Sequence, residues 1–326
     1  MGGGMAGAID DKYQLVGSSQ VMRDLREKVL RVAAHGSARV LISGPSGSGK
    51  ECVARMLHNR SPRFSMPFVT FNCATVAKEL LEDRLWGHVK GAFTGAFKDA
   101  DGLFAAAEGG TLFLDEIGEM DLTLQGLLLR VLETDCYQKI GSSIDVRCDV
   151  RLVCATNRSL PRMVKEGKFR KDLYERLNVV PIRTPELKMH KSDIPEVAAA
   201  WFARKKYEKT LSVEQVAALM RYDYPGNVRE LLALLERAAT LDVSNYDALI
   251  EEQKMLNAEE SSEGAAAEVD VPENLNEMIA WHVRRVMDRC GGNVSKAATR
   301  LGIVRNTVRK YLCAENEHTN GQRSAI

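Results

Sequence analysis

Residues 44–50 read Gly44-Pro45-Ser46-Gly47-Ser48-Gly49-Lys50, which fits the phosphate-binding pattern G-x-x-x-x-G-K. The stretch follows an apolar run at 39–43 (RVLIS) that is typical of a buried strand, and it precedes a predicted helix at 51–59. Glycines let the backbone wrap so that its N–H groups face phosphate oxygens, and the helix N-terminus adds a favourable dipole. Because the lysine stands between a strand and a helix, we predict a nucleotide-binding loop rather than a plain Gly-rich turn.

One position departs from the general pattern. Lys50 is followed by Glu51, where most loops of this kind have a Ser or Thr that ligates Mg²⁺. Two carboxylates lie downstream, since the apolar run at 111–115 (TLFLD) ends in Asp115 and continues with Glu116. We predict that Asp115 holds Mg²⁺ through water, and that Glu116 shares this metal site and polarises the attacking water. The alternative is a strand end that only faces solvent.

Short apolar runs recur along the first part of the chain, separated by helical stretches such as 124–133. They lie at 39–43, 68–72, 111–115, 150–155 and 178–182. Strands that alternate with helices predict an α/β fold with a doubly wound parallel sheet covered on both faces. Thr156 and Asn157 follow one of these strands, where a polar side chain lies in the ligand crevice, although Asn is also common in simple turns.

After Pro185 only helical periodicity remains, across 193–240, which predicts a helical lid subdomain. Asn227 and Glu230 resemble a capping box at the start of one of its helices. Residues 251–273 then carry eight acidic residues against one lysine, a composition typical of a solvated linker. The predicted domains are a disordered lead-in at 1–13, an α/β nucleotide-binding subdomain at 14–185, a helical lid at 186–250, an acidic linker at 251–273, a DNA-binding domain at 274–313 and a tail at 314–326.

The C-terminal part is basic, with eight Lys and Arg against two acidic residues at 275–313. Helical periodicity at 274–290, 293–301 and 303–312, interrupted by glycines, predicts three helices of the helix-turn-helix kind. Arginine suits guanine and asparagine suits adenine in the major groove. The alternative is a basic three-helix domain that contacts another partner. The candidate DNA-binding residues are Asn293, Ser295, Arg305, Asn306, Thr307, Arg309 and Lys310.

Whole-chain properties narrow the function further. A formal net charge of +1 over 326 residues indicates that any binding of nucleic acid comes from a local patch. The seven cysteines form no C-x-x-C pair and are odd in number, which favours reduced thiols in a packed core. No signal peptide or membrane-spanning run is present in the sequence, so we expect a cytoplasmic protein.

A hexapeptide between the nucleotide-binding loop and the acidic pair leads to a family. Its residues are Gly91, Ala92, Phe93, Thr94, Gly95 and Ala96 (GAFTGA), preceded by Trp86-Gly87-His88. Two glycines and small residues around one phenylalanine make a poor core segment, but a good flexible loop with one apolar contact at its tip. The hexapeptide resembles the signature loop of the sigma-54-dependent activators, a branch of the AAA+ ATPases, whose nucleotide-binding loop also ends in Lys-Glu. The resemblance covers about residues 16–240, and the basic C-terminal part is similar to the Fis-like DNA-binding domain of the same family.

The resemblance implies an activity and its partners. It implies an ATPase that uses ATP and Mg²⁺, assembles into a homo-oligomeric ring that is most often a hexamer, binds enhancer DNA and converts closed complexes of sigma-54 RNA polymerase into open ones. The GAFTGA loop would contact sigma-54 through Phe93 and Thr94.

The resemblance also implies roles for single residues. Asn72 would restrain Glu116, Thr156 and Asn157 would be the first sensor, and Arg229 would be the second sensor. Arg170 and Arg176 would reach the γ-phosphate in the neighbouring subunit.

Two other functions stay open at the level of sequence. One is a DNA-tethered AAA+ remodeller that never contacts sigma-54, which the GAFTGA loop argues against. The other is a passive DNA-binding regulator with a decayed ATPase, which the intact Lys50 and Glu116 argue against. The short lead-in leaves no room for a sensory domain, so we expect control through expression level, oligomerisation or a separate protein acting in trans.

Overall fold

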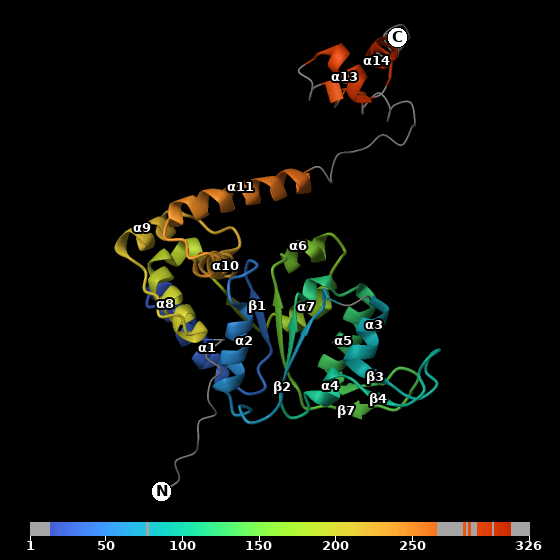
Figure 1. Cartoon of the computed structure of the whole chain (residues 1–326). Helices are drawn as coiled ribbons and strands as arrows, with labels where there is room; N and C mark the ends of the chain where they lie inside the picture. Colours follow the sequence, from blue (N-terminus) through green and yellow to red (C-terminus); the bar gives the residue numbers. More distant parts are fainter. Residues whose placement is uncertain are drawn as a thin grey trace, which may run out of the picture. The chain divides into compact units, whose positions relative to one another are not determined.

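The computed structural model describes residues 14–75, 78–265, 283–284, 286–287, 292–301 and 303–313. The chain divides into two compact units, Met1–Glu252 and Gln253–Ile326. The first unit contains a parallel sheet (Figure 1). Its five strands lie in the order β2-β5-β8-β1-β9. Its strands are β1 (Val40–Ser43), β2 (Phe68–Asn72), β5 (Thr111–Asp115), β8 (Arg151–Thr156) and β9 (Val180–Arg183). All five predicted strands are confirmed to within two residues, and so is the α/β fold.

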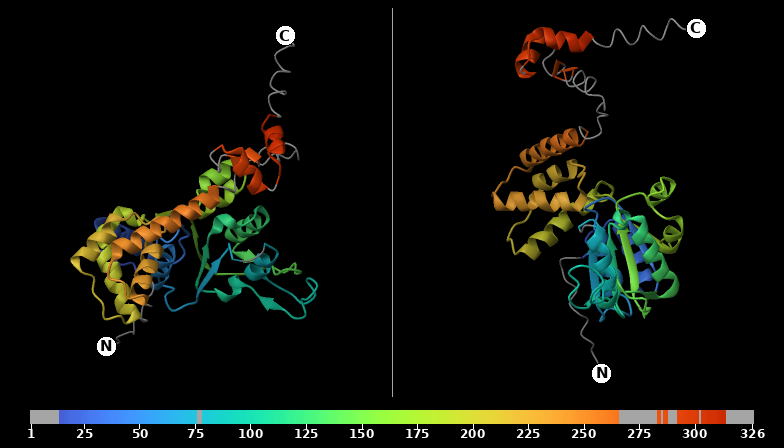
Figure 2. Two further views of the ribbon diagram at one scale, coloured as in Figure 1. Left: turned by 45° about the horizontal axis from the view of Figure 1, so that its top comes forward. Right: turned by 90° about the vertical axis from the view of Figure 1, so that its right-hand side faces the viewer.

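Helices cover both faces of this sheet, as Figures 1 and 2 show. Successive side chains of a strand point to opposite faces, so Ile42 packs against α1 (Gln20–Ala33) and α2 (Lys50–Asn59), whereas Leu41 packs on the other side. The second face is covered by α3 (Lys78–Trp86), α4 (Leu103–Ala106), α5 (Leu122–Thr134), α6 (Leu160–Lys165) and α7 (Lys171–Leu177). Burial on both faces explains why the strands are almost continuously apolar.

Two small hairpins extend from the second face. One pairs β3 (Gly87–His88) with β4 (Ala100–Asp101), and the other pairs β6 (Cys136–Tyr137) with β7 (Val146–Arg147). The two residues Gly87 and His88, which precede the predicted GAFTGA loop, form a strand. A Cβ on Gly87 would lie 2.3 Å from the carbonyl oxygen of Ala100, so this pairing requires glycine. The GAFTGA hexapeptide therefore lies at the tip of a hairpin.

The lid follows β9 and is entirely helical in the part of the chain that the structure describes. It consists of η3 (Leu187–Asp193), α8 (Ile194–Lys205), α9 (Val213–Arg221), α10 (Asn227–Thr240) and the start of α11 (Tyr246–Ala265). Its core gathers Trp201, Leu219 and Leu235. Residues 251–265 of the predicted linker are helical and continue α11, whereas residues 266–273 lie outside the described part. Glu, Ala, Lys and Leu are strong helix formers, and this propensity prevails over the acidic composition.

The predicted capping box at Asn227 is also wrong. Asn227 has a left-handed backbone with φ 55°, and its side chain makes no capping bond. The Glu230 half is present, since its Oε2 accepts a hydrogen bond from the Gly226 N–H at 2.7 Å. A complete capping box occurs on α9 instead, between Ser212 and Gln215.

The second unit contains α13 (Val294–Leu301) and α14 (Arg305–Cys313), which pack through Ala298 and Val308. Val283 completes this small core. The last two predicted helices are confirmed, with α14 starting two residues later than expected. The predicted helix at 274–290 lies mostly outside the described residues, of which 283–284 and 286–287 are helical.

Free thiols are found at Cys52, Cys73, Cys136, Cys148 and Cys154. Burial raises the pKa of the Cys73 thiol to about 12, so it stays protonated and unreactive. No helix among the described residues is long and apolar enough to cross a membrane.

Candidate active site

The nucleotide-binding loop connects β1 to α2 as predicted. Gly47 and Gly49 have left-handed φ angles of 73° and 89°, which turn the backbone around the space in front of α2. The Gly44 N–H donates to the Thr156 carbonyl at 3.2 Å and thereby fixes the loop to β8. The Lys50 side chain is only 7% exposed, and its Nζ lies 3.2 Å from the Gly44 carbonyl oxygen.

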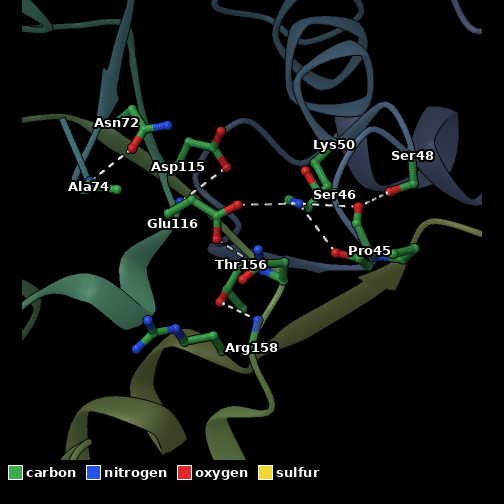
Figure 3. A network of polar contacts seen from close by, with 12 residues as sticks. Pro45, Ser46, Ser48, Lys50, Asn72, Ala74, Asp115, Glu116, Thr156 and Arg158 are labelled. Carbon is green, nitrogen blue, oxygen red and sulfur yellow. Dashed lines mark hydrogen bonds and ion pairs between the residues drawn. The ribbon is translucent and has the colours of Figure 1, made fainter. Parts of the chain in front are cut away.

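The two predicted carboxylates end β5 beside this lysine. Glu116 Oε1 lies 3.6 Å from Lys50 Nζ, and Oε2 accepts a hydrogen bond from the Asn157 N–H at 3.1 Å (Figure 3). The Glu116 backbone is left-handed, with φ 51°, which turns the residue out of the strand direction. Burial and the neighbouring Glu116 charge raise the pKa of Asp115, and Lys50 opposes this shift. Lys50, Asp115, Glu116 and Asn157 are therefore brought together as predicted.

Asn72 occupies the neighbouring strand, where it is the register partner of Asp115. Its carboxamide oxygen accepts a hydrogen bond from the Ala74 N–H at 2.8 Å, whereas the Glu116 carboxylate contacts Lys50 and Asn157 (Figure 3). Asn72 is thus beside the acidic pair, but its restraint of Glu116 stays a prediction.

The lid contacts the loop directly through α10. Arg229 Nη1 donates to the Ser46 hydroxyl at 2.7 Å, and Asn227 Nδ2 donates to the Ser46 carbonyl at 3.0 Å. Asn227 also accepts from the Leu187 N–H at 2.9 Å, at the start of the lid. Arg229 was predicted to reach this site, but the part played by Asn227 was missed. The signal available in the sequence was an Asn after Pro-Gly, a residue type that tolerates left-handed backbone.

A second contact that the sequence did not indicate lies under the loop. The Thr184 hydroxyl is 2.6 Å from the Ser48 hydroxyl. A Cβ on Gly44 would lie only 1.9 Å from the Thr184 hydroxyl oxygen, so this position requires glycine. Beside this point a cavity of about 580 Å³ opens at the carboxyl ends of β1, β8 and β9, lined among others by Gly44, Asn157 and Arg183. The volume lies in the range of small-molecule and cofactor sites.

Glu51 and the two remaining arginines make ion pairs of their own. Glu51 Oε1 accepts from Arg55 Nε at 3.0 Å. Arg170 and Arg176 lie at the two ends of α7, exposed, where they pair with Asp172 at 2.7 Å and with Glu133 at 3.8 Å. Neither arginine contacts the nucleotide-binding loop of its own chain, so their action in trans stays a prediction.

The GAFTGA tip is closed by backbone hydrogen bonds from Gly91 N–H to the Ala96 carbonyl at 2.8 Å and from Ala96 N–H to the Phe93 carbonyl at 3.0 Å. Ala96 is buried, whereas Thr94 is exposed. Phe93 is 45% exposed, and its ring lies edge-on to His88 with centroids 4.9 Å apart. The tip is therefore an ordered turn with one half-exposed aromatic ring.

The predicted DNA-binding residues lie on α14 and at the start of α13. Arg305, Asn306, Arg309 and Lys310 are exposed, Thr307 is half-buried, and Val308 is buried beneath them. Asn293 and Ser295 are exposed as well, and the Asn293 side chain accepts from the Lys296 N–H at 3.1 Å. A polar and basic helix face over an apolar interior is the arrangement that a recognition helix needs.

Three consecutive parts of the chain match known protein families. Residues 15–183 match the family model of the sigma-54 interaction domain, residues 188–268 that of the AAA+ ATPase lid domain, and residues 282–312 that of the bacterial regulatory proteins of the Fis family.

Similar proteins are found among curated sequences and solved structures. Transcriptional regulatory protein ZraR of Escherichia coli is 41% identical over 91% of this chain and 68% of its own length. Response regulator protein PilR of Pseudomonas aeruginosa is 38% identical over 92% of this chain and 69% of its own length. The structure of NtrX from Brucella abortus in complex with ADP superposes with a TM-score of 0.67 at 31% identity, over 93% of this chain and 69% of that one.

Proposed function

Because this chain belongs to the sigma-54-dependent transcription activators of the AAA+ family, with a Fis-type DNA-binding domain, we propose that it hydrolyses ATP to remodel sigma-54 RNA polymerase at promoters. The observation that carries the proposal is the convergence of Lys50, Glu116 and Arg229 on one loop, with Lys50 Nζ 3.6 Å from Glu116 and Arg229 Nη1 2.7 Å from Ser46. Crystals of NtrX contain ADP in one case and ATP in another, which supports the same ligand here.

Each of these residues has a chemical task in hydrolysis. The loop N–H groups and Lys50 bind the phosphates and neutralise the charge that develops on them. Glu116 is placed to orient the attacking water and to accept its proton. Asn157 holds the Glu116 carboxylate through its N–H, and Arg229 carries the position of the lid to the loop.

The residues also fit Mg²⁺, which protein sites usually hold through one or two carboxylates together with substrate phosphates. Among the described residues no group of three His, Cys, Asp or Glu side chains is placed to bind a metal alone. Asp115, with support from Glu116, would hold Mg²⁺ beside the loop, where the ion supplies charge neutralisation to the phosphates. The raised pKa of Asp115 is lowered again by any cation bound next to it.

Arg170 and Arg176 complete the site only from another copy of the chain. Both are exposed, and their ion pairs are with Asp172 and Glu133 rather than with the loop, which leaves them available to a neighbouring subunit. We therefore propose a ring, a hexamer as in the family, in which hydrolysis depends on assembly, since an arginine supplied in trans is worth about 10³–10⁵ in rate.

The output of the reaction is mechanical. Phe93 and Thr94, at the tip of the β3–β4 hairpin, are placed to contact sigma-54, and α14 to bind enhancer DNA in the major groove. With such partners the protein acts in the cytoplasm, and regulation by a separate protein in trans stays a prediction.

The test is open-complex formation by sigma-54 RNA polymerase on closed promoter DNA, comparing wild type with Thr94→Ala. We expect wild type to open the promoter and Thr94→Ala to hydrolyse ATP without opening it, while Lys98→Ala, an exposed residue two positions past the hexapeptide, behaves as wild type. Hydrolysis by wild type without opening of any sigma-54 promoter would assign the chain to the DNA-tethered remodellers instead. An absence of hydrolysis would leave a passive regulator.

A further inference from the structure

A glutamine of α5 lies wholly inside the protein between the acidic pair and the exposed arginines. The Gln125 side chain has an exposed fraction of 0% and is surrounded by the apolar core of the second sheet face. A buried carboxamide costs free energy unless each polar atom has a partner. Its surroundings therefore show what it is kept for.

Both polar atoms of the Gln125 carboxamide bond to the backbone of two separate segments. Nε2 donates to the Met120 carbonyl at 2.7 Å and to the Lys168 carbonyl at 3.2 Å. Oε1 accepts from the Arg170 N–H at 2.8 Å. Both N–H donors and the oxygen therefore each have a partner. One of these partners, Arg170, is 45 residues away from Gln125 in the sequence.

The first segment is the turn that follows the catalytic carboxylate. η2 (Ile117–Glu119) begins at Glu116, whose carbonyl accepts from the Glu119 N–H at 2.9 Å. Met120 ends this turn, since its N–H donates to the Ile117 carbonyl at 3.2 Å. The Met120 carbonyl, and with it Gln125, is therefore joined to Glu116 through one short helical turn.

The second segment starts the helix that carries the arginines. Lys168 and Arg170 stand on either side of Phe169, whose ring is buried in the same core as α5. Gln125 thus bonds to the backbone on both sides of an anchored residue. Arg170 is the N-cap residue of α7, and its side chain makes no capping hydrogen bond. Its backbone N–H is held by Gln125, while its guanidinium remains exposed.

We infer that Gln125 is a positioning residue, which sets the place of Arg170 for the neighbouring subunit and links it to the Glu116 turn of its own site. The inference rests on the proposed function, in which Arg170 acts in trans. A shift of the Glu116 turn after hydrolysis reaches Arg170 through a single side chain, so the state of one site is passed to the next.

The first measurement is ATP turnover by Gln125→Met, which keeps the volume and removes all three bonds. We expect turnover to fall roughly 10- to 100-fold, the effect of an approximately 1 Å displacement of a catalytic group, while nucleotide binding is kept. Gln215→Met is the matched control, because Gln215 also accepts from a backbone N–H, that of Ser212 at 2.9 Å, and donates to a backbone carbonyl, that of Ser244 at 3.1 Å. Equal losses in both variants would overturn the inference.

Subunit mixing separates an effect in trans from one in cis. Glu116→Gln subunits cannot hydrolyse but carry intact arginines, so a mixture with Gln125→Met should regain turnover at the Gln125→Met sites. Arg170→Ala mixed with Glu116→Gln is the reference. If the reference recovers and the Gln125→Met mixture does not, Gln125 acts on its own site and the inference fails. If the reference itself does not recover, the role of Arg170 in trans is wrong and the inference falls with it.

Gln125→Glu covers the case in which Gln125→Met does not fold. Its side chain keeps the acceptor for Arg170, and in this apolar place the acid form, which restores one donor, is favoured. We expect its turnover relative to wild type to rise as pH falls, and to be regained on mixing with Glu116→Gln. A turnover ratio that does not change with pH, or a mixture without recovery, would overturn the inference.

Discussion

Two regions of the first unit differ in how their polar side chains are held. The nucleotide side is the surroundings of the loop at 44–50, and the outward side is formed by the GAFTGA hairpin and α7. Around the loop, Lys50, Thr156 and Asn227 are buried. Their hydrogen bonds join segments that are far apart in the sequence: Asn227 and Ser46, for example, are separated by 181 residues. On the side that carries the GAFTGA hairpin and α7, Phe93 is half-exposed, Phe97 is 85% exposed, and the Arg170 guanidinium pairs with Asp172 at the surface.

The difference separates a region whose contacts are complete within one chain from a region whose exposed side chains are available to another molecule. Buried polar groups are fixed because an unmade bond there is costly, whereas an exposed ion pair contributes little to stability and exchanges easily. We therefore expect substitutions on the nucleotide side to change binding and stability, and those on the outward side to change function without them.

The strongest test of this contrast is Arg170→Ala. Turnover of the assembled protein should fall about 10³-fold or more, since the role proposed for this arginine is to act on a neighbour's γ-phosphate. Nucleotide affinity and the free energy of unfolding should stay at wild-type values, because the Arg170 side chain is exposed and its ion pair with Asp172 lies at the surface, while the backbone N–H that bonds to Gln125 is kept in alanine. Steady-state turnover, a fluorescent nucleotide titration and urea unfolding measure the three quantities, with Lys168→Ala as control; weaker nucleotide binding would contradict the contrast.

Glu116→Gln tests the inner side at its catalytic centre. We expect turnover to fall about 10²–10⁴-fold, the usual value of general-base catalysis. The amide keeps the shape of the carboxylate and its acceptor for Asn157, so ATP should still bind. Single-turnover hydrolysis and equilibrium binding decide the matter, and a loss of binding equal to the loss of turnover would show that Glu116 serves the ground state.

Arg229→Ala tests the contact between lid and loop. Removal of its hydrogen bond to Ser46, together with its charge near the phosphates, should weaken ATP affinity roughly 10- to 150-fold, from about 1.5–3 kcal/mol for a charged hydrogen bond. Isothermal titration measures the change. Arg221→Ala, which removes an exposed pair with Asp247 elsewhere in the lid, should bind ATP as wild type does.

The smallest expected effect is a pH dependence of stability from the core at the C-terminal end of α2. His58 is buried, with Nδ1 2.9 Å from the Thr111 hydroxyl, and desolvation lowers its pKa, with Arg151 adding to the shift. Below the pKa of an unfolded histidine, about 6.5, the unfolded chain binds a proton at His58 that the folded chain does not bind. The contribution of this residue to the free energy of unfolding is therefore fully present above about pH 6.5 and decreases as the pH falls below that value. Urea unfolding should show a decrease of under about 1 kcal/mol in this window, absent in His58→Asn.

Much of the fold could be predicted because its decisive segments are local. Phe68–Asn72 and Thr111–Asp115 are the strands that the sequence predicts, to the residue, since each is a short apolar run bounded by turn residues. Lys50, Asp115 and Glu116 meet because the carboxyl ends of parallel strands share one edge.

The errors arise where tertiary contacts prevail over local signals. Asn227 had the pattern of a cap, yet its carboxamide bonds to Ser46 and Leu187, which only the docked lid brings near. Residues 251–265 had the composition of a linker, but their helix propensity, joined to the docked start of α11 at Tyr246 and Leu249, gives a helix. Gln125 gave no signal at all, because a glutamine in an apolar helix is ordinary until its partners are known.

The glycine at position 47 sets a limit on how the lid can move. A Cβ there would lie 2.2 Å from the Gly226 carbonyl oxygen, so the two backbones already touch. The lid cannot approach the loop further at this point. We expect the lid to move during the reaction cycle either by rotation about this contact, with Gly47 and Gly226 as the pivot, or by moving away from the loop.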